Sequence, residues 1–366
     1  MDPSFEYVFP AIRGIQGGRE YYVSMCPLRL LPKIFLFDDE ELLPELRAQR
    51  VLNRARVPEI SRYVLENRDA YVFSAITASV DGEVQFTPIG HGGEASKVGT
   101  LHVNMQSRFI INDGQHRRAA IEMALKSEPG IGDETIAVVF FVDRGLERCQ
   151  QMFADLNRHA VRPSRSLGLL YDHRNELSKL ARLIVMGSAV FRDVVEMERS
   201  TLSERSRKLF TLSSIYSANE ELIDGAQITD AQKTAAVCAS FWDAVAEQMP
   251  EWRFVRESKM TAGEVRRDFL HSHAIVLQAL GIAGRELLAL PEGIWRKKLS
   301  ALRKINWSRS NAKVWEGRAL IGGRVSKASH NVTLTCNYIK QQLALELGPE
   351  EMRVEKAFKR GRETTT

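Results

Sequence analysis

The stretch Arg108–Leu125, RFIINDGQHRRAAIEMAL, decides the fold of the first part of this chain. An apolar strand, Phe109–Ile111, runs into an Asn-Asp-Gly turn, and a basic helix follows directly. The first turn of a helix has backbone N–H groups without partners and carries partial positive charge. The corner therefore predicts a cradle for a phosphate or another anion, which is formed with His116, Arg117 and Arg118. An ordinary strand–turn–helix with solvated arginines is the alternative.

Each residue of this corner has a chemical use. Gly114 lets the backbone approach a ligand because it has no Cβ, and Gln115 and His116 offer neutral or switchable hydrogen bonds. Arg117 can donate to two phosphate oxygens at once. Asp113 repels anions, so it fits better as a helix cap, a metal ligand or a base that orients a water molecule. The candidate catalytic residues are Asp113, Gln115 and His116, and a purely structural use of the corner stays open.

The five residues Asp113–Arg117 also form the signature of the DGQHR-domain family, which is distantly related to the ParB/sulfiredoxin-like fold. Within it the chain resembles the DndB family, which regulates bacterial DNA phosphorothioation (sulfur modification). The resemblance covers residues 9–281 and includes Met152–Asn157 and Arg50–Asn53. In sulfiredoxins a cysteine takes the place of Gln115, so that redox chemistry is excluded here. ParB-like relatives contact a nucleoside triphosphate at this helix start, which implies a nucleotide site accompanied by magnesium.

A second polar cluster follows at Asp155–His159 and leads into an Arg-Pro-Ser-Arg-Ser break. The resemblance implies that this cluster packs near the signature helix. The candidate ligand-binding residues are then Asp113, Gly114, Gln115, His116, Arg117, Arg118, Asn157 and Arg158. Alternatively, the acid and the amide cap helices and the arginines are solvated. No cluster has the spacing of a metal site, and His271 and His273 are two residues apart, on different sides of a helix.

Positive charge is concentrated late in the chain. The window Trp295–His330 has ten Lys and Arg against the single acid Glu316, a net charge of +9, whereas the whole chain carries +5. Three tryptophans in this window suit base stacking, or they anchor the segment to the core. A second basic stretch is Arg199–Lys208. The predicted DNA contacts are Arg205, Arg207, Lys208, Arg296, Lys297, Lys298, Arg303, Lys304, Arg309, Lys313, Arg324 and Lys327. A solvated basic surface is the alternative, and no clear helix-turn-helix pattern is present.

Composition and pattern predict an α+β fold with two domains. Of the 366 residues, 44% are hydrophobic and 27% charged, which is typical of a globular protein with a real core. No apolar run is long enough to span a membrane, no secretory signal is recognisable, and the four cysteines are scattered, so we expect a cytoplasmic protein. Residues 1–150 should form a mixed-sheet domain of ParB/sulfiredoxin-like fold, residues 151–350 a mainly helical domain, and residues 351–366 a flexible tail.

Individual elements follow from local pattern. Thr135–Val142 is a continuous apolar run typical of a buried strand, and Asp81-Gly82 predicts a hairpin turn that pairs the strands on its two sides. In the second half, helices are predicted at 166–172, 175–186, 205–219, 230–248, 262–281, 293–304 and 329–347, and a flexible loop at 322–327.

The resemblance implies a repressor that binds the promoter of the operon encoding the phosphorothioation enzymes, with double-stranded DNA as its partner. Short operators are usually bound by symmetric dimers, so we expect a homodimer. The nucleotide or effector site would then tune DNA binding. A nucleotide-hydrolysing or DNA-cleaving enzyme centred on the DGQHR corner is the alternative. A third possibility is a module that docks onto the modification enzymes without touching DNA.

Overall fold

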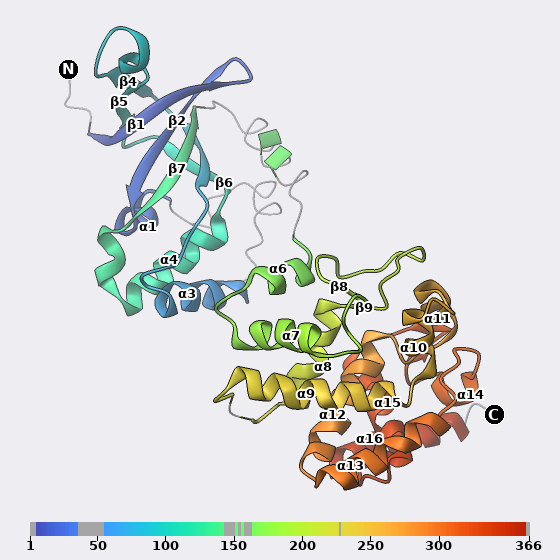
Figure 1. Ribbon diagram of the computed structural model, residues 1–366. Helices are drawn as coiled ribbons and strands as arrows, with labels where there is room; N and C mark the ends of the chain where they lie inside the picture. Colours follow the sequence, from blue (N-terminus) through green and yellow to red (C-terminus); the bar gives the residue numbers. More distant parts are fainter. Residues whose placement is uncertain are drawn as a thin grey trace. The chain divides into compact units, whose positions relative to one another are not determined.

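The structure is a computed structural model that describes residues 5–35, 55–142, 151–152, 155–156, 163–226 and 228–363. The chain divides into two compact units, Met1–Val161 and Arg162–Thr366. Unit 1 contains a seven-stranded sheet, whereas unit 2 is mainly helical (Figure 1). The predicted α+β fold class, with a mixed sheet first and helices after it, is therefore confirmed.

The sheet of unit 1 has the strand order β4-β5-β1-β2-β7-β3-β6. All neighbours are antiparallel except β3 and β7, which are parallel. The strands are β1 (Glu6–Gln16), β2 (Arg19–Pro27), β3 (Ile76–Asp81), β4 (Val84–Pro88), β5 (Val98–Asn104), β6 (Arg108–Asp113) and β7 (Thr135–Val142). The predicted strand at 135–142 is confirmed to the residue, and Ile136, Val138 and Phe140 along it are buried. The core beneath the sheet includes Phe9, Leu101 and Phe140.

The remaining elements in the described part of unit 1 are helical. They are η1 (Leu28–Leu30), α1 (Leu31–Ile34), α3 (Arg56–Glu66), η2 (Gly93–Ser96), α4 (Gln115–Ser127) and η3 (Pro129–Asp133). Helices α3 and α4 pack side by side below the sheet in the view of Figure 1. Because α4 begins directly after β6, the DGQHR corner lies where a strand of the sheet passes into this helix pair.

The hairpin predicted at Asp81-Gly82 is wrong. Strand β3 pairs with β6 and β7, and β4 pairs with β5. Asp81 faces Arg108 on β6, and Val84 faces Val103 on β5. The chain therefore bends between β3 and β4, so that β3 pairs with β6 and β4 pairs with β5. Strand β3 is almost fully buried, whereas β4 alternates between half-buried and exposed residues at the sheet edge. Burial of β3 between two partners outweighed the local turn preference of Asp-Gly.

Unit 2 is built around two buried helices, α8 (Leu212–Leu222) and α12 (Ala274–Leu288). The elements around them are α6 (Arg165–Tyr171), α7 (Glu176–Gly187), β8 (Val195–Glu196), β9 (Phe210–Thr211), α9 (Ala231–Ala246), α10 (Pro250–Arg256), α11 (Ala262–Asp268), α13 (Glu292–Leu299), η4 (Ser300–Lys304), α14 (Ala312–Trp315), β10 (Leu320–Ile321), β11 (Arg324–Val325), α15 (Ser329–Gln342) and α16 (Pro349–Glu363). No helix among the described residues has the length and apolar character that crossing a bilayer requires.

Several helix predictions need correction. The helix predicted at 205–219 begins only at Leu212, where Thr211 and Ser214 form a capping box. The helix predicted at 262–281 is two helices, because backbone bonds between residues 268–270 and 307–309 interrupt it. The loop predicted at 322–327 contains β11 and the turn of the hairpin β10–β11, which passes through two glycines of positive φ. The tail predicted at 351–366 is helical as far as Glu363, because Glu355 forms a buried ion pair with Arg318.

Candidate functional site

The DGQHR corner is held by one arginine. Gly114 takes a left-handed conformation, φ 110°, between β6 and α4. Arg117 Nη2 donates to Asp113 Oδ2 at 2.7 Å and to the Ala75 carbonyl at 3.0 Å. A Cβ at Gly114 would lie 3.0 Å from Ile76 Cγ1 and 3.1 Å from Arg117 Nη2. The glycine is therefore needed both for the turn and for the approach of the guanidinium.

The other polar residues of the corner also bond within the protein. Arg118 is buried and donates to Glu122 Oε2 at 2.6 Å and to the Pro32 carbonyl at 3.3 Å. Gln115 Nε2 donates to the Ile111 carbonyl at 3.2 Å. These contacts hold the buried Arg118 side chain against Glu122 and α1 and not at an open surface. Among the predicted ligand-binding residues, Asn157 and Arg158 lie outside the described residues.

His116 stays neutral around pH 7. Burial lowers its pKa first, the charges of Arg56 and Arg117 lower it further, and the nearby Asp113 raises it by less. Beside the corner is a cavity of about 380 Å³, and among the predicted residues that the structure describes only Arg117 lines it. No group of three or more His, Cys, Asp or Glu side chains in the described part of the chain could hold a metal ion.

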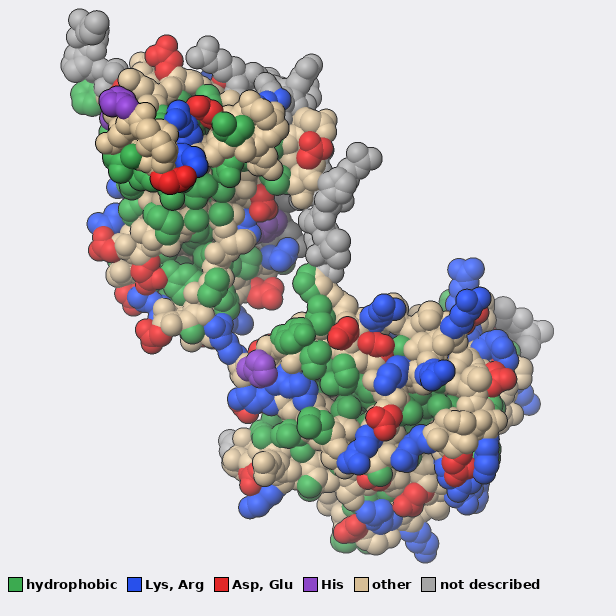
Figure 2. All heavy atoms as spheres, turned by 45° about the horizontal axis from the view of Figure 1, so that its top comes forward, with side chains coloured by type: hydrophobic (Ala, Val, Ile, Leu, Met, Phe, Trp, Pro, Cys, Tyr) green, Lys and Arg blue, Asp and Glu red, His purple; other side chains and the backbone are tan. Residues whose placement is uncertain are grey.

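The basic residues of unit 2 form two separate groups. Arg205, Arg207 and Lys208 lie in the loop before β9, to which Arg266 donates hydrogen bonds. Arg309 donates to the carbonyl of Arg267 and to that of Gly323, the residue before Arg324. The second group is on α13 and η4, next to α9, and contains Arg296, Lys297, Lys298, Arg303 and Lys304. Lys313 on α14 and Lys327 after β11 are exposed outside both groups. Figure 2 shows Lys and Arg side chains distributed over the visible face of unit 2.

Many side chains of the second group are engaged with the protein itself. Arg296 donates to Glu292 at 2.8 Å and to Ser240 at 2.8 Å. Lys298 donates to two carbonyls after α15, and Arg303 donates to the carbonyl of Glu247 at 2.9 Å. The tryptophans of the basic window are buried, with exposures of 6% or less, so they anchor the segment to the core.

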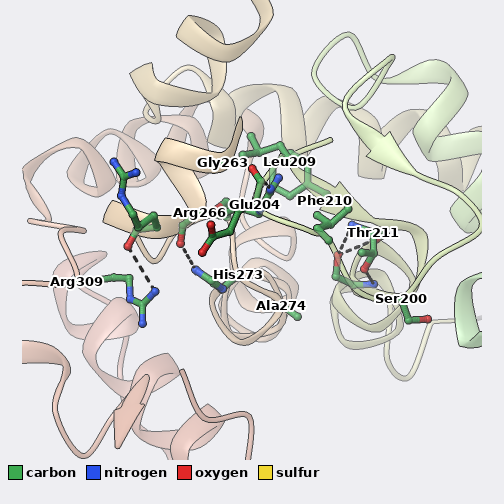
Figure 3. Close-up of a pocket in the computed structure, with 14 residues that line it drawn as sticks. Ser200, Glu204, Leu209, Phe210, Thr211, Gly263, Arg266, His273, Ala274 and Arg309 are labelled. Carbon is green, nitrogen blue, oxygen red and sulfur yellow. Dashed lines mark hydrogen bonds between the residues drawn. The ribbon is translucent and has the colours of Figure 1, made fainter. Parts of the chain in front are cut away.

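A cavity of about 350 Å³ lies beside the first group, and Arg309 of that group lines it. Figure 3 shows Arg309 at one side of it and Ser200 and Thr211 at the other, with Arg266 and His273 between them. We call five arginines the basic rim. Arg267 and Arg309 line the cavity, and Arg205, Arg207 and Arg324 lie on the segments to which Arg266 and Arg309 are bonded.

Two side chains fix the loops that carry the basic rim. Arg266 donates to the carbonyls of Ser203, Ser206 and Lys208, which pins the loop before β9. Arg309 donates to the Gly323 carbonyl at 3.0 Å and thereby places the β10–β11 hairpin. The rim residues thus come from segments that are far apart in the sequence but bonded to one another.

The acidic groups at this site are Asp268, which is paired, and Glu204. Arg267 contacts Asp268 through two hydrogen bonds of 2.9 Å, and these bonds hold the pKa of the Asp268 carboxyl below its ordinary value. Glu204 lines the cavity. Burial lowers the pKa of His273 to about 4, although its bond to the Arg266 carbonyl opposes this shift. The imidazole is therefore neutral at pH 7.

Sequence reasoning missed Arg266, Arg267, Ser272 and His273 at this cavity. An Arg-Arg pair followed by a Ser between two histidines was visible, but a single continuous helix was predicted there. The sequence alone does not show the break, because it results from tertiary hydrogen bonds. These bonds end the first helix at Asp268 and place Ser272 just before α12.

Comparison with known proteins gives one match. A family model described as "DndB: DNA-sulfur modification-associated" matches residues 9–346, nearly the whole chain. No curated protein and no solved structure matches. The likeness to ParB and sulfiredoxin folds therefore stays a prediction.

Proposed function

Since the chain belongs to the DndB family of DNA-sulfur modification-associated proteins, we propose that it is a DNA-binding regulator of such a modification system. In this proposal it represses the operon of the modification enzymes, and unit 2 contacts the promoter DNA through the basic rim. The observation that carries the proposal is the rim itself, which comprises five arginines on segments bonded together, two of which line one cavity.

The two units differ in net charge. Unit 2 contains 33 Lys and Arg against 24 Asp and Glu, a net charge of +9, whereas unit 1 contains 18 against 22, a net charge of −4. Lys and Arg side chains that replace counterions on DNA phosphates supply most of the non-specific affinity. The imbalance favours unit 2 as the part that meets DNA.

Within unit 2, the exposure of the side chains indicates which arginines can contact DNA. Arg205, Arg207 and Arg324 are exposed, and no side-chain ion pair is recorded for them within residues 163–226 and 228–363. Their guanidinium groups can therefore bind phosphates without breaking a bond inside the protein. The bonds of Arg266 and Arg309 hold the backbone of their loops in place, which lowers the entropy lost on binding.

The test is a gel-shift titration of the full chain on duplex promoter DNA at several salt concentrations. The variant has Arg205, Arg207 and Arg324 changed to Gln. Each lost phosphate contact reduces the slope of log affinity against log salt by about 0.9, so the slope should become shallower by about 2.7.

A charge-matched control removes three exposed lysines elsewhere in unit 2, Lys233, Lys297 and Lys304, each changed to Gln. If this control loses as much slope as the rim variant, charge alone matters and the rim is not the interface. If the wild-type chain binds DNA without salt dependence, or not at all, the proposal fails and a module that docks onto the enzymes is favoured.

We also propose a homodimer on DNA and an effector site at the DGQHR corner. A two-fold symmetric operator would present the same phosphate pattern to two copies of the basic rim. Sedimentation of the protein with and without operator DNA tests the stoichiometry, and two chains per operator are expected. One chain per duplex would contradict this part of the proposal.

A further inference from the structure

Two buried helices begin at the same cavity. Gly281 of α12 packs against Ala218 of α8, and Gly284 packs against Leu222. Both contacts advance in the same direction along the chain, so α8 and α12 run parallel. Their first turns therefore lie at the same end of unit 2, and Thr211 and Ala274 line the cavity there. Two parallel macrodipoles place partial positive charge at this wall.

The cavity wall also contains hydrogen-bond donors for which the described residues offer no recorded acceptor. Ser272 is 5% exposed and lines the cavity, and its Oγ has no hydrogen-bond partner among the described residues. A buried hydroxyl without a partner costs about 1–3 kcal/mol. No backbone bond is recorded for the Ala274 N–H in the part of the chain that the structure describes. Neither donor has a recorded acceptor among the described residues, and both would gain from an acceptor in the cavity.

The charge and the volume of the cavity limit the kinds of ligand that can bind there. Arg266, Arg267 and Arg309 line the cavity against the single carboxylate of Glu204. The apolar part of the wall is formed by Leu202, Leu209 and Phe210. A volume of about 350 Å³ is at the lower end of small-molecule sites. An anionic head with a compact, partly apolar body meets these requirements.

We propose that this cavity binds the phosphate group of a nucleotide-sized ligand. The Ser272 hydroxyl and the Ala274 N–H donate to the phosphate oxygens, and Arg267 and Arg309 balance their charge. The ligand is either a free nucleotide or a nucleotide unit of a DNA strand, since both present the same group. The inference goes beyond the proposed function, because binding of a small phosphate ligand does not require recognition of a promoter.

The test is calorimetric titration of the full chain without DNA. The probes are deoxyadenosine 5′-monophosphate, deoxyadenosine and inorganic phosphate. We expect the monophosphate to bind, inorganic phosphate to bind more weakly, and deoxyadenosine not to bind. Ser272→Ala and Arg267→Gln should each weaken binding of the monophosphate by about tenfold, the effect of one charge-assisted hydrogen bond.

Two control variants match these changes. Ser178 is also a buried serine whose Oγ has no partner among the described residues, but it lies on α7 and does not line the cavity. Arg253 is 67% exposed beside Glu257, as Arg267 is 66% exposed beside Asp268. Ser178→Ala and Arg253→Gln should leave the affinity unchanged. Ser272→Ala removes an unsatisfied group, so it should not unfold the protein.

The outcomes separate this inference from the proposed function. Equal behaviour of deoxyadenosine and its monophosphate, or equal effects of Ser272→Ala and Ser178→Ala, overturns the inference. Salt-dependent DNA binding without monophosphate binding would refute the cavity site and leave the proposed function intact, and the reverse result would refute only the function. If the monophosphate displaces bound DNA, the occupant is a DNA phosphate, whereas simultaneous binding identifies a free nucleotide.

Discussion

The ion pair between Arg318 and Glu355 should be the most sensitive point for the stability of unit 2. The two side chains are only 7% and 5% exposed, and they form two hydrogen bonds of 2.9 and 2.6 Å. Arg318 also donates to the Leu334 carbonyl and lies over the rings of Tyr338 and Phe358. This pair fastens α16 to the segment before the β10–β11 hairpin. The perturbation is Glu355→Gln, which keeps the shape and removes the charge.

The expected loss follows from burial. Removing one partner of a buried ion pair leaves the other charge without compensation and costs about 3–5 kcal/mol. Because glutamine still accepts one hydrogen bond from Arg318, the lower end of this range, about 3 kcal/mol, is expected. Changing both residues to apolar ones, Arg318→Met with Glu355→Leu, should recover most of the loss, since no charge then stays buried.

Tryptophan fluorescence during urea unfolding measures this loss in unit 2 alone, because all five tryptophans lie between residues 242 and 315. Glu350→Gln is the control, since Glu350 pairs with Arg353 on the same helix and both side chains are exposed. That change should cost less than about 1 kcal/mol. If Glu355→Gln costs no more than Glu350→Gln, the buried pair does not hold α16 and the reasoning is refuted.

The same pair predicts a dependence on pH. Burial raises the pKa of Glu355, but the hydrogen bond and charge of Arg318 outweigh burial and hold it below its ordinary value of 4.5. The unfolded chain therefore takes up this proton first. The stabilisation is complete above pH 4.5 and is lost as the pH falls through the lower, folded pKa. Glu355→Gln should remove this part of the acid sensitivity, and an unchanged acid profile would contradict it.

Three further predictions concern other parts of the chain. Gly114→Ala should destabilise unit 1 by about 1–3 kcal/mol through backbone strain at φ 110°, measured by hydrogen exchange in β6 and α4, whereas Gly92→Ala, in open space, should change little. Magnesium with ATP, GTP or CTP should give no phosphate release; a release that Arg117→Ala abolishes would instead support the enzyme alternative. Burial raises the pKa of the Cys238 and Cys336 thiols to about 12, so a thiol reagent at pH 8 should label their peptides only after unfolding.

The elements that the sequence predicts well are those decided by local chemistry. Ser164, Asn175 and Asp230 each cap the helix that follows, and each helix begins within one residue of its predicted start. The apolar run of β7 is similarly explicit. Where the prediction failed, distant partners decide the structure. The break at Phe269 depends on a bridge to Ser308, and the C-terminal helix depends on Arg318.

In the candidate sites, too, local features could be predicted from the sequence and contacts between distant residues could not. The strand–turn–helix at Gly114 could be predicted, because the turn needs a glycine and the apolar pattern is clear on both sides. That the Arg118 side chain turns inward to Glu122 and Pro32 could not, since Pro32 is far away in sequence. The unit 2 cavity combines residues from Ser200 to Arg309, so no single stretch shows it.

Close packing at Gly281 has a consequence for residues far from it. A methyl group there would overlap the Ala218 carbonyl oxygen, so α8 and α12 could not keep their present separation. Gly281 is nine residues after Ser272, and the part of α12 between them rises by about 1.5 Å per residue. The absence of a side chain at Gly281 thus sets the spacing of the two helix starts at the cavity, although Gly281 does not line the cavity. Random mutagenesis for lost ligand affinity should therefore recover substitutions at Gly281 as well as in the cavity wall.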